Sequence, residues 1–190
     1  MMENLSNPES IDALNELDNL SDKWIVMVET SAEKMVGNSL SIIKHLIDNG
    51  SVGIILSASR PYNNLLNLYE KNGIDTSKIL FIDCISKSQK IDLAQQGNVI
   101  YHNAVSDLTN ISLSIRKTLD KIPGEKFVFI DSITTMLIHN NPEIFTRFVH
   151  GMITKLRLEG VSGFLISIEE ESDNMIRSSI AELCDKVINI

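Results

Sequence analysis

The sequence is poor in the residues that build disulfide frameworks and metal sites. Its 190 residues include two cysteines, Cys84 and Cys184, and no CxxC motif. A disulfide scaffold is therefore excluded, and we expect both thiols to be buried small side chains in a reducing cytoplasm. The four histidines lack the spacing of metal ligands, so we expect no metal site from them; they are His45, His102, His139 and His150.

Long apolar runs and an excess of basic charge are also missing. No stretch approaches the ~20 apolar residues of a membrane span, and the first residues, MMENLSNPES, lack the order of a signal peptide. The 17 basic residues are outnumbered by 25 acidic ones, for a net charge of −8. Such a surface repels phosphate backbones, so we expect neither a nucleic-acid nor a membrane partner, and a cytoplasmic location.

Apolar residues are plentiful enough for one sizeable core. They make up 43% of the chain, which excludes disorder for most of it. The length favours a single domain, which we place at residues 23–190. Residues 1–22 differ, because they are acidic and rich in Asn and Ser. This leader is predicted to be either a frayed end or a short amphipathic helix that docks on the domain or on a partner, with apolar positions at Ile11, Leu14, Leu17 and Leu20.

From Trp24 onward, short apolar runs alternate with stretches of helical periodicity. The runs are continuous, which is typical of strands buried on both faces. Strand and helix in alternation predict a three-layer α/β/α fold with a mostly parallel central sheet. Ligands of such folds bind after the strands. The predicted strands are residues 24–28, 52–56, 78–82, 98–101, 126–130, 163–167 and 186–190.

The segment after the first predicted strand has the layout of a phosphate-binding loop. Such a loop needs glycines that let backbone N–H groups surround a phosphate, a lysine that neutralises it and a Ser or Thr that holds magnesium. Here the frame GxxxxGKS becomes Ala32-x-x-x-x-Gly37-Asn38-Ser39. A lysine about 4 Å from a phosphate contributes about 4 kcal/mol. Its replacement by Asn38 predicts weak triphosphate binding at best.

A second candidate is Asp131, which ends the apolar strand of KFVFIDSITTML (126–137). A carboxylate at this edge would contact the magnesium of a bound nucleotide, directly or through water. The alternative is that Asp131 caps a loop or helix through backbone contacts. If nucleotide binds, the candidate binding residues are therefore Gly37, Asn38, Ser39 and Asp131.

Taken together, these segments resemble the RecA/KaiC-like ATPase domain, a P-loop NTPase fold, over about residues 22–190. VGIILSASRPYNNLLNLYEKNGID is similar to the family's second strand and helix, and the segment around Asp131 to its Walker B strand. The resemblance implies a pair of glutamates after the second strand, one of which activates water. The matching positions here are Ala58 and Ser59. The run Glu169–Glu171 supplies carboxylates after the sixth strand, although an exposed acidic loop is its commoner meaning.

Three functional hypotheses follow. The first is a catalytically inactive member of the family, with no catalytic residues and no required cofactor, that acts as a regulatory module through a protein partner or self-association. The second is a divergent ATP-binding protein or slow ATPase that uses Ser39 and Asp131 with weakly bound Mg-ATP. The third, from another class, is a receiver-like signalling domain with acidic strand ends at Asp83 and Asp131.

Overall fold

The computed structural model describes residues 23–89, 93, 97–168 and 174–190. The leader, residues 1–22, and the acidic run Glu169–Glu171 lie outside the described residues, so the predictions made for them stay predictions.

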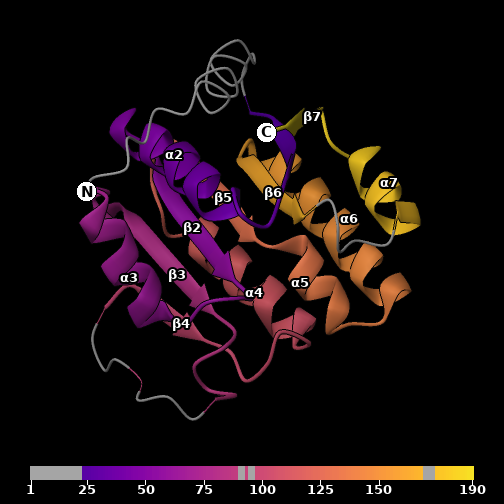
Figure 1. The fold of residues 1–190 in the computed structure, drawn as a ribbon, viewed down its shortest axis with the longest axis horizontal. Coiled ribbons are helices and arrows are strands. Elements are labelled where there is room, and N and C mark those ends of the chain that lie inside the picture. Colours follow the sequence, from indigo (N-terminus) through magenta and orange to yellow (C-terminus); the bar gives the residue numbers. More distant parts are fainter. Residues whose placement is uncertain (1–22, 90–92, 94–96, 169–173) are drawn as a thin grey trace.

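Seven strands form one sheet within the described residues (Figure 1). All seven predicted runs are confirmed, with each end within two residues of its expected place. The order across the sheet is β4-β3-β2-β5-β6-β1-β7, and every paired strand is parallel to its neighbour. The strands are β1 Ile25–Thr30, β2 Val52–Ser57, β3 Ile79–Asp83, β4 Val99–Tyr101, β5 Lys126–Asp131, β6 Ser162–Ile168 and β7 Lys186–Asn189.

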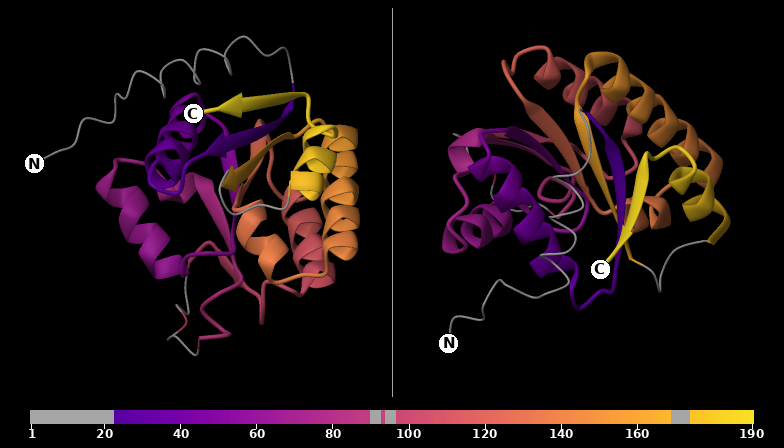
Figure 2. Two further views of the ribbon diagram at one scale, coloured as in Figure 1. Left: turned by 45° about the vertical axis from the view of Figure 1, so that its right-hand side comes forward. Right: turned by 90° about the horizontal axis from the view of Figure 1, so that it is seen from above.

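Helices cover both faces of the sheet, which confirms the predicted three-layer α/β/α architecture (Figure 2). α2 and α3 pack on one face, and α4 to α7 pack on the other. None of the described helices is both long and apolar enough to cross a membrane. The helices are α2 Met35–Asp48, α3 Tyr62–Lys71, the 3-10 turn η1 Thr76–Lys78, α4 Leu108–Leu119, α5 Ile133–Ile138, α6 Pro142–Glu159 and α7 Asn174–Ala181.

The two faces of the sheet have different cores. Under α2 and α3, the rings of Phe81, Phe127, Phe129 and Phe164 are fully buried. Gly53 on β2 makes room for one of these rings, because a Cβ at this position would lie 2.7 Å from Phe127 Cζ. Under α4 to α7 the core is mostly aliphatic. This burial on both faces explains why the strands are apolar without alternation.

Helix α6 shows how local sequence sets the element ends. The Asn141 side chain accepts hydrogen bonds from the backbone N–H groups of Glu143 and Ile144 (3.0 and 3.2 Å), and Pro142 occupies the first turn. Gly160 ends the helix in the left-handed conformation, with φ of 62°. These two signals fix where the chain turns back into β6.

Candidate functional site

The predicted site residues lie at the carboxyl ends of the parallel strands, the edge at which α/β folds place their ligands. Gly37, Asn38 and Ser39 belong to the start of α2, directly after β1. Asp131 is the last residue of β5. In the sheet, β6 lies between these two strands. The fold therefore brings both candidate segments to one edge.

The turn between β1 and α2 is short and bonded within itself. Helix α2 begins at Met35, two residues before Gly37. The backbone N–H groups of Lys34 and Met35 donate to the Ser31 carbonyl (3.2 and 3.0 Å), and that of Asn38 donates to the Lys34 carbonyl (3.0 Å). A phosphate cradle needs such N–H groups directed at the ligand. Here these three donors are engaged by the chain's own carbonyls.

Asn38 stands at the position of the loop lysine, and its side chain is bonded inside the protein. It is 4% exposed, and its Nδ2 donates to Thr30 Oγ1 at 2.9 Å. A neutral amide in this position adds no positive charge. The neighbouring Ser39 is also buried, and its Oγ has no hydrogen-bond partner among the described residues. Gly37 faces open space where a side chain would begin, so no close contact requires a glycine there.

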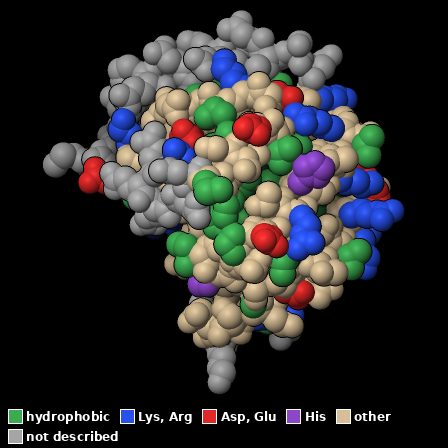
Figure 3. Space-filling view, turned by 90° about the vertical axis from the view of Figure 1, so that its right-hand side faces the viewer, with side chains coloured by type: hydrophobic (Ala, Val, Ile, Leu, Met, Phe, Trp, Pro, Cys, Tyr) green, Lys and Arg blue, Asp and Glu red, His purple; other side chains and the backbone are tan. Residues whose placement is uncertain are grey.

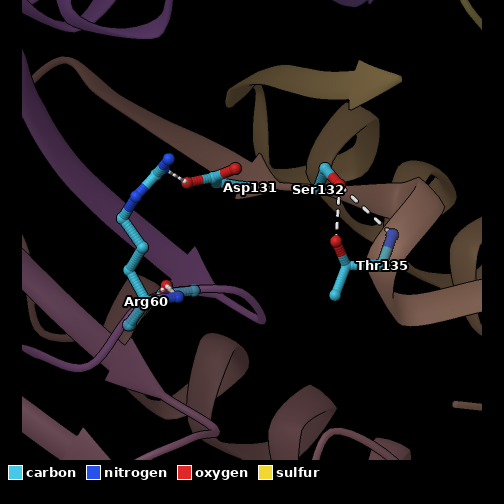
Figure 4. A network of polar contacts seen from close by, with 5 residues as sticks. Arg60, Asp131, Ser132 and Thr135 are labelled. Atoms are coloured by element: carbon cyan, nitrogen blue, oxygen red, sulfur yellow. Dashed lines mark hydrogen bonds and ion pairs between the residues drawn. The ribbon is translucent and has the colours of Figure 1, made fainter. Parts of the chain in front are cut away.

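Asp131 ends β5 with an almost fully buried carboxylate (Figure 4). Its Oδ2 accepts a hydrogen bond from Arg60 Nη1 at 3.5 Å, while its Oδ1 has no partner among the described residues. Burial raises the pKa of Asp131 above its usual value, and the Arg60 guanidinium and the Ser59 hydroxyl partly oppose this rise. Arg60 is therefore the counter-charge of this carboxylate.

The loop that carries Arg60 is held against the end of β5. The Ser57 hydroxyl donates to the Arg60 carbonyl (2.8 Å) and accepts from the Arg60 N–H (3.2 Å). The N–H of Ala58 donates to the Asp131 carbonyl (2.9 Å). Ala58 is buried and Ser59 is exposed, so the two positions expected to hold glutamates carry a methyl group and a hydroxyl.

The next residues after Asp131 start a short helix. The Ser132 hydroxyl accepts from the Thr135 N–H at 3.2 Å and lies 3.1 Å from the Thr135 hydroxyl (Figure 4). The Ser132 hydroxyl makes this cap, and within the described part of the chain no backbone N–H donates to the Asp131 carboxylate, as the capping alternative would require. The Asp131 carboxylate faces Arg60 instead.

Asp83, the other acidic strand end, has a different environment. It is 1% exposed at the end of β3. Its Oδ2 accepts from the Tyr62 N–H (2.7 Å) and the Ser86 hydroxyl (2.5 Å), and its Oδ1 from the N–H groups of Ile85 (2.7 Å) and Ser86 (2.9 Å). Four donors saturate this carboxylate, which joins the start of α3 to the loop after β3. Its role is structural.

The comparison with protein families decides the identity of the domain. Residues 37–190 match the family described as "ATPase: KaiC". The chain belongs to the KaiC ATPase family. For this KaiC-family chain, the predicted resemblance is confirmed at the level of family and fold, and the receiver-like hypothesis loses its support. No curated protein matches the chain.

Solved structures similar to the KaiC-family chain support the same fold. An uncharacterized protein from Pyrococcus horikoshii, solved in complex with an unknown peptide, has a TM-score of 0.71 and 12% identity, covering 94% of this chain and 82% of that one. A KaiC-like protein from P. horikoshii OT3 has a TM-score of 0.63 and 16% identity, covering 90% and 72%. The flagellar accessory protein FlaH from Methanocaldococcus jannaschii has a TM-score of 0.62 and 11% identity, covering 94% and 76%. At such identities the likeness concerns the fold alone.

Sequence reasoning missed Arg60 as a member of this site. The signal was present, because β2 pairs with β5 and Ser57 is opposite Asp131 in the register. A basic residue three positions after Ser57 therefore lies near the Asp131 carboxylate. Without the strand order, however, nothing in the sequence indicates that these two strands are neighbours.

Proposed function

We propose that this KaiC-family chain is a catalytically inactive domain that works as a regulatory or protein-interaction module, through a protein partner or through self-association. The observation that carries the proposal is the state of the first turn of α2. Its backbone N–H groups bond to the carbonyls of Ser31 and Lys34, and Asn38 stands where a phosphate-binding lysine would be. A triphosphate would meet no lysine at this position of the loop and few open donors there.

Two further features support loss of hydrolysis. Ala58 and Ser59 offer no carboxylate to orient an attacking water. The Asp131 carboxylate, which a magnesium ion would need, is neutralised by Arg60 at 3.5 Å. A nucleotide with its magnesium therefore fits these residues poorly.

The second candidate, a divergent Mg-ATP-binding protein, is favoured by one specific observation. Ser39 Oγ and Asp131 Oδ1 are buried oxygens without hydrogen-bond partners among the described residues. An unsatisfied buried polar atom costs about 1–3 kcal/mol. A magnesium ion with its water ligands would satisfy both atoms, because these oxygen types are the ligands that magnesium prefers.

Mg-ATP titration of the full chain separates the two candidates. A site with nucleotide at 100 times its dissociation constant stabilises the protein by about 2.7 kcal/mol, or about 5–10 °C in melting temperature for a domain of this size. We expect no saturable shift up to millimolar Mg-ATP and no phosphate release. Magnesium alone is the parallel arm, since it probes Ser39 and Asp131 without a phosphate.

Two variants control the titration. Asn38→Lys returns the missing cation, so a shift in this variant alone would indicate that the lysine is what the natural chain lacks. Asp131→Asn removes the carboxylate that a magnesium ion requires. Phosphate release by the natural chain that Asp131→Asn abolishes would overturn the proposal and establish the second candidate.

A further inference from the structure

A hollow of about 350 Å³ lies between α4 and α6. Its floor is apolar and includes Ile115, Phe148 and Met152. Phe148 is half-buried, so part of its ring remains open to an occupant. The hollow lies on the side of the sheet opposite α2 and α3.

Cations surround this apolar floor. Arg116 on α4 and Arg147 on α6 line the hollow with exposed side chains, and neither has an ion-pair partner within the described residues. Lys155 lines it as well and pairs with Glu159 on the next turn of α6. A view of one face of the molecule shows Lys and Arg side chains gathered along one side, with hydrophobic side chains among them (Figure 3). An occupant that fits has acidic groups beside an apolar stripe.

The chain itself contains a segment that combines acidic and apolar residues. Residues 1–22 hold six of the 25 acidic residues and none of the 17 basic ones. Their apolar positions recur every three residues from Ile11 to Leu20, which predicts an amphipathic helix. Asn7-Pro8 supplies a start signal for it.

The leader also joins the domain at the end of the hollow. Lys23 Nζ lies 3.9 Å from Glu125 Oε1, in the loop that follows α4. The same side chain borders Gly160, the residue that ends α6, where an added Cβ would lie 3.0 Å from Lys23 Cδ. The chain therefore enters the domain beside the end of α6 and the start of β5, which follows the loop from α4.

The lengths match. From Arg147 to Lys155, the hollow follows about 12 Å of α6 at 1.5 Å per residue. A helix over residues 8–20 is about 20 Å long, and the two residues before Lys23 span up to about 7 Å when extended. This reach is enough to cover the hollow from its end at Gly160.

We propose that residues 1–22 dock as an acidic amphipathic helix in the hollow between α4 and α6 of their own chain. The apolar stripe covers Phe148 and its neighbours, and the acidic residues face Arg116 and Arg147. The inference stands independently of nucleotide binding, because the hollow lies between α4 and α6 whereas the candidate site lies at the carboxyl edge of the sheet.

Crosslinking within the full chain tests this docking. Leu17→Cys is combined with Ser112→Cys, on the rim of the hollow, and treated with a short thiol-reactive crosslinker. The control pair combines Leu17→Cys with Asn67→Cys, an exposed position of α3 on the opposite face. The native thiols give little background, because burial raises the pKa of both Cys84 and Cys184 to about 12.

We expect crosslinks within one chain to form at least about fivefold faster for the Ser112 pair than for the control pair. Equal rates for the two pairs would overturn the proposal. Crosslinks found only between two chains, which mass distinguishes, would also overturn it and would assign the groove to the leader of a second copy.

Charge reversal supplies the second measurement. Arg116→Glu with Arg147→Glu should slow the Ser112 crosslink about fivefold, since two exposed ion pairs of about 0.5 kcal/mol each are lost. Lys117→Glu, on α4 but outside the lining of the hollow, is the matched control. Adding Asp12→Lys and Glu16→Lys to the double reversal should restore the rate. A crosslinking rate that none of these charge substitutions changes would contradict the proposed mode of docking.

Discussion

The ion pair between Arg60 and Asp131 provides the sharpest test of the site as described. The change is Arg60→Ala, which removes the guanidinium that lies 3.5 Å from Asp131 Oδ2. The carboxylate stays buried, with a side chain 4% exposed, and then has no counter-charge among the described residues. We expect this substitution to destabilise the fold although it lies at the edge of the sheet and outside the core.

The magnitude follows from the distance and the burial. Two unit charges 3.5 Å apart interact by about 5 kcal/mol at an effective dielectric of 20. Arg60 keeps 30% of its side chain exposed, so solvent screens part of this energy. Breaking a buried pair costs about 3–5 kcal/mol when both partners are fully buried. With the exposure of Arg60 taken into account, we expect a loss of about 2 kcal/mol at neutral pH.

The loss should depend on pH in a definite direction. Burial already raises the pKa of Asp131 in the folded protein above its unfolded value of 3.8, and removing Arg60 raises it further. Between the two pKa values the folded chain binds more protons than the unfolded chain, so stability rises as the pH falls. The deficit of Arg60→Ala is therefore largest at neutral pH and shrinks as the pH falls through the raised folded pKa, because the buried carboxyl group then takes up a proton.

Urea unfolding at several pH values measures both effects. Asp131→Asn in the Arg60→Ala background should recover most of the loss, because the uncompensated charge is gone. The matched control is Arg157→Ala, since Arg157 pairs with Asp185 at 2.6 Å but both side chains are more than 40% exposed. This control should cost less than about 1 kcal/mol. An Arg60→Ala loss that is equal at all pH values, or no larger than the control, would refute the reasoning.

Two further predictions concern the scaffold of the site and the sheet. Asp83→Asn should lower the free energy of unfolding by about 2–4 kcal/mol in urea titrations, because an amide cannot accept all four hydrogen bonds that the carboxylate accepts; a loss under 1 kcal/mol would contradict the structural role. Gly53→Ala should cost about 1–3 kcal/mol, because its methyl group would lie 2.7 Å from Phe127 Cζ. Gly37→Ala, in α2 with open space around the added carbon, should instead stabilise by about 0.5–1 kcal/mol, and equal effects of the two alanines would show that the contact is not decisive.

The fold was predictable from the sequence because strands that are buried on both faces are apolar without alternation. A strand such as Phe127–Ile130 is apolar at every position, since Phe127 and Phe129 face α2 and α3 while Val128 and Ile130 face the other layer. Ends of elements were less predictable. The helical spacing of apolar residues in α4 continues to Ile122, but the helix ends at Leu119, and the N–H groups of Lys121 and Ile122 bond to the Thr118 carbonyl in the turn that follows.

The site was only partly predictable, because its interactions join segments that the sequence does not place side by side. The missing lysine and glutamates are visible as Asn38, Ala58 and Ser59. The start of α2 at Met35 and the pairing of Arg60 with Asp131 are not visible in the sequence, because they depend on backbone position and on strand order. Helix propensity alone gives no reason why α2 should begin at Met35 rather than at Gly37.

The stability of the sheet and the chemistry of its edge are separate in this chain. The buried strands are held by apolar contacts on both faces, in which the polar strand ends Thr30 and Asp131 take no part. A KaiC-family fold can therefore keep its core while the edge residues change. Each buried polar group left at the edge still needs a partner. Arg60 supplies a charge to Asp131 and Thr30 accepts from Asn38, so both side chains have partners within the protein. Ser39 Oγ and Asp131 Oδ1 remain unmatched, and this makes magnesium the most sensitive probe of whether the replacement is complete.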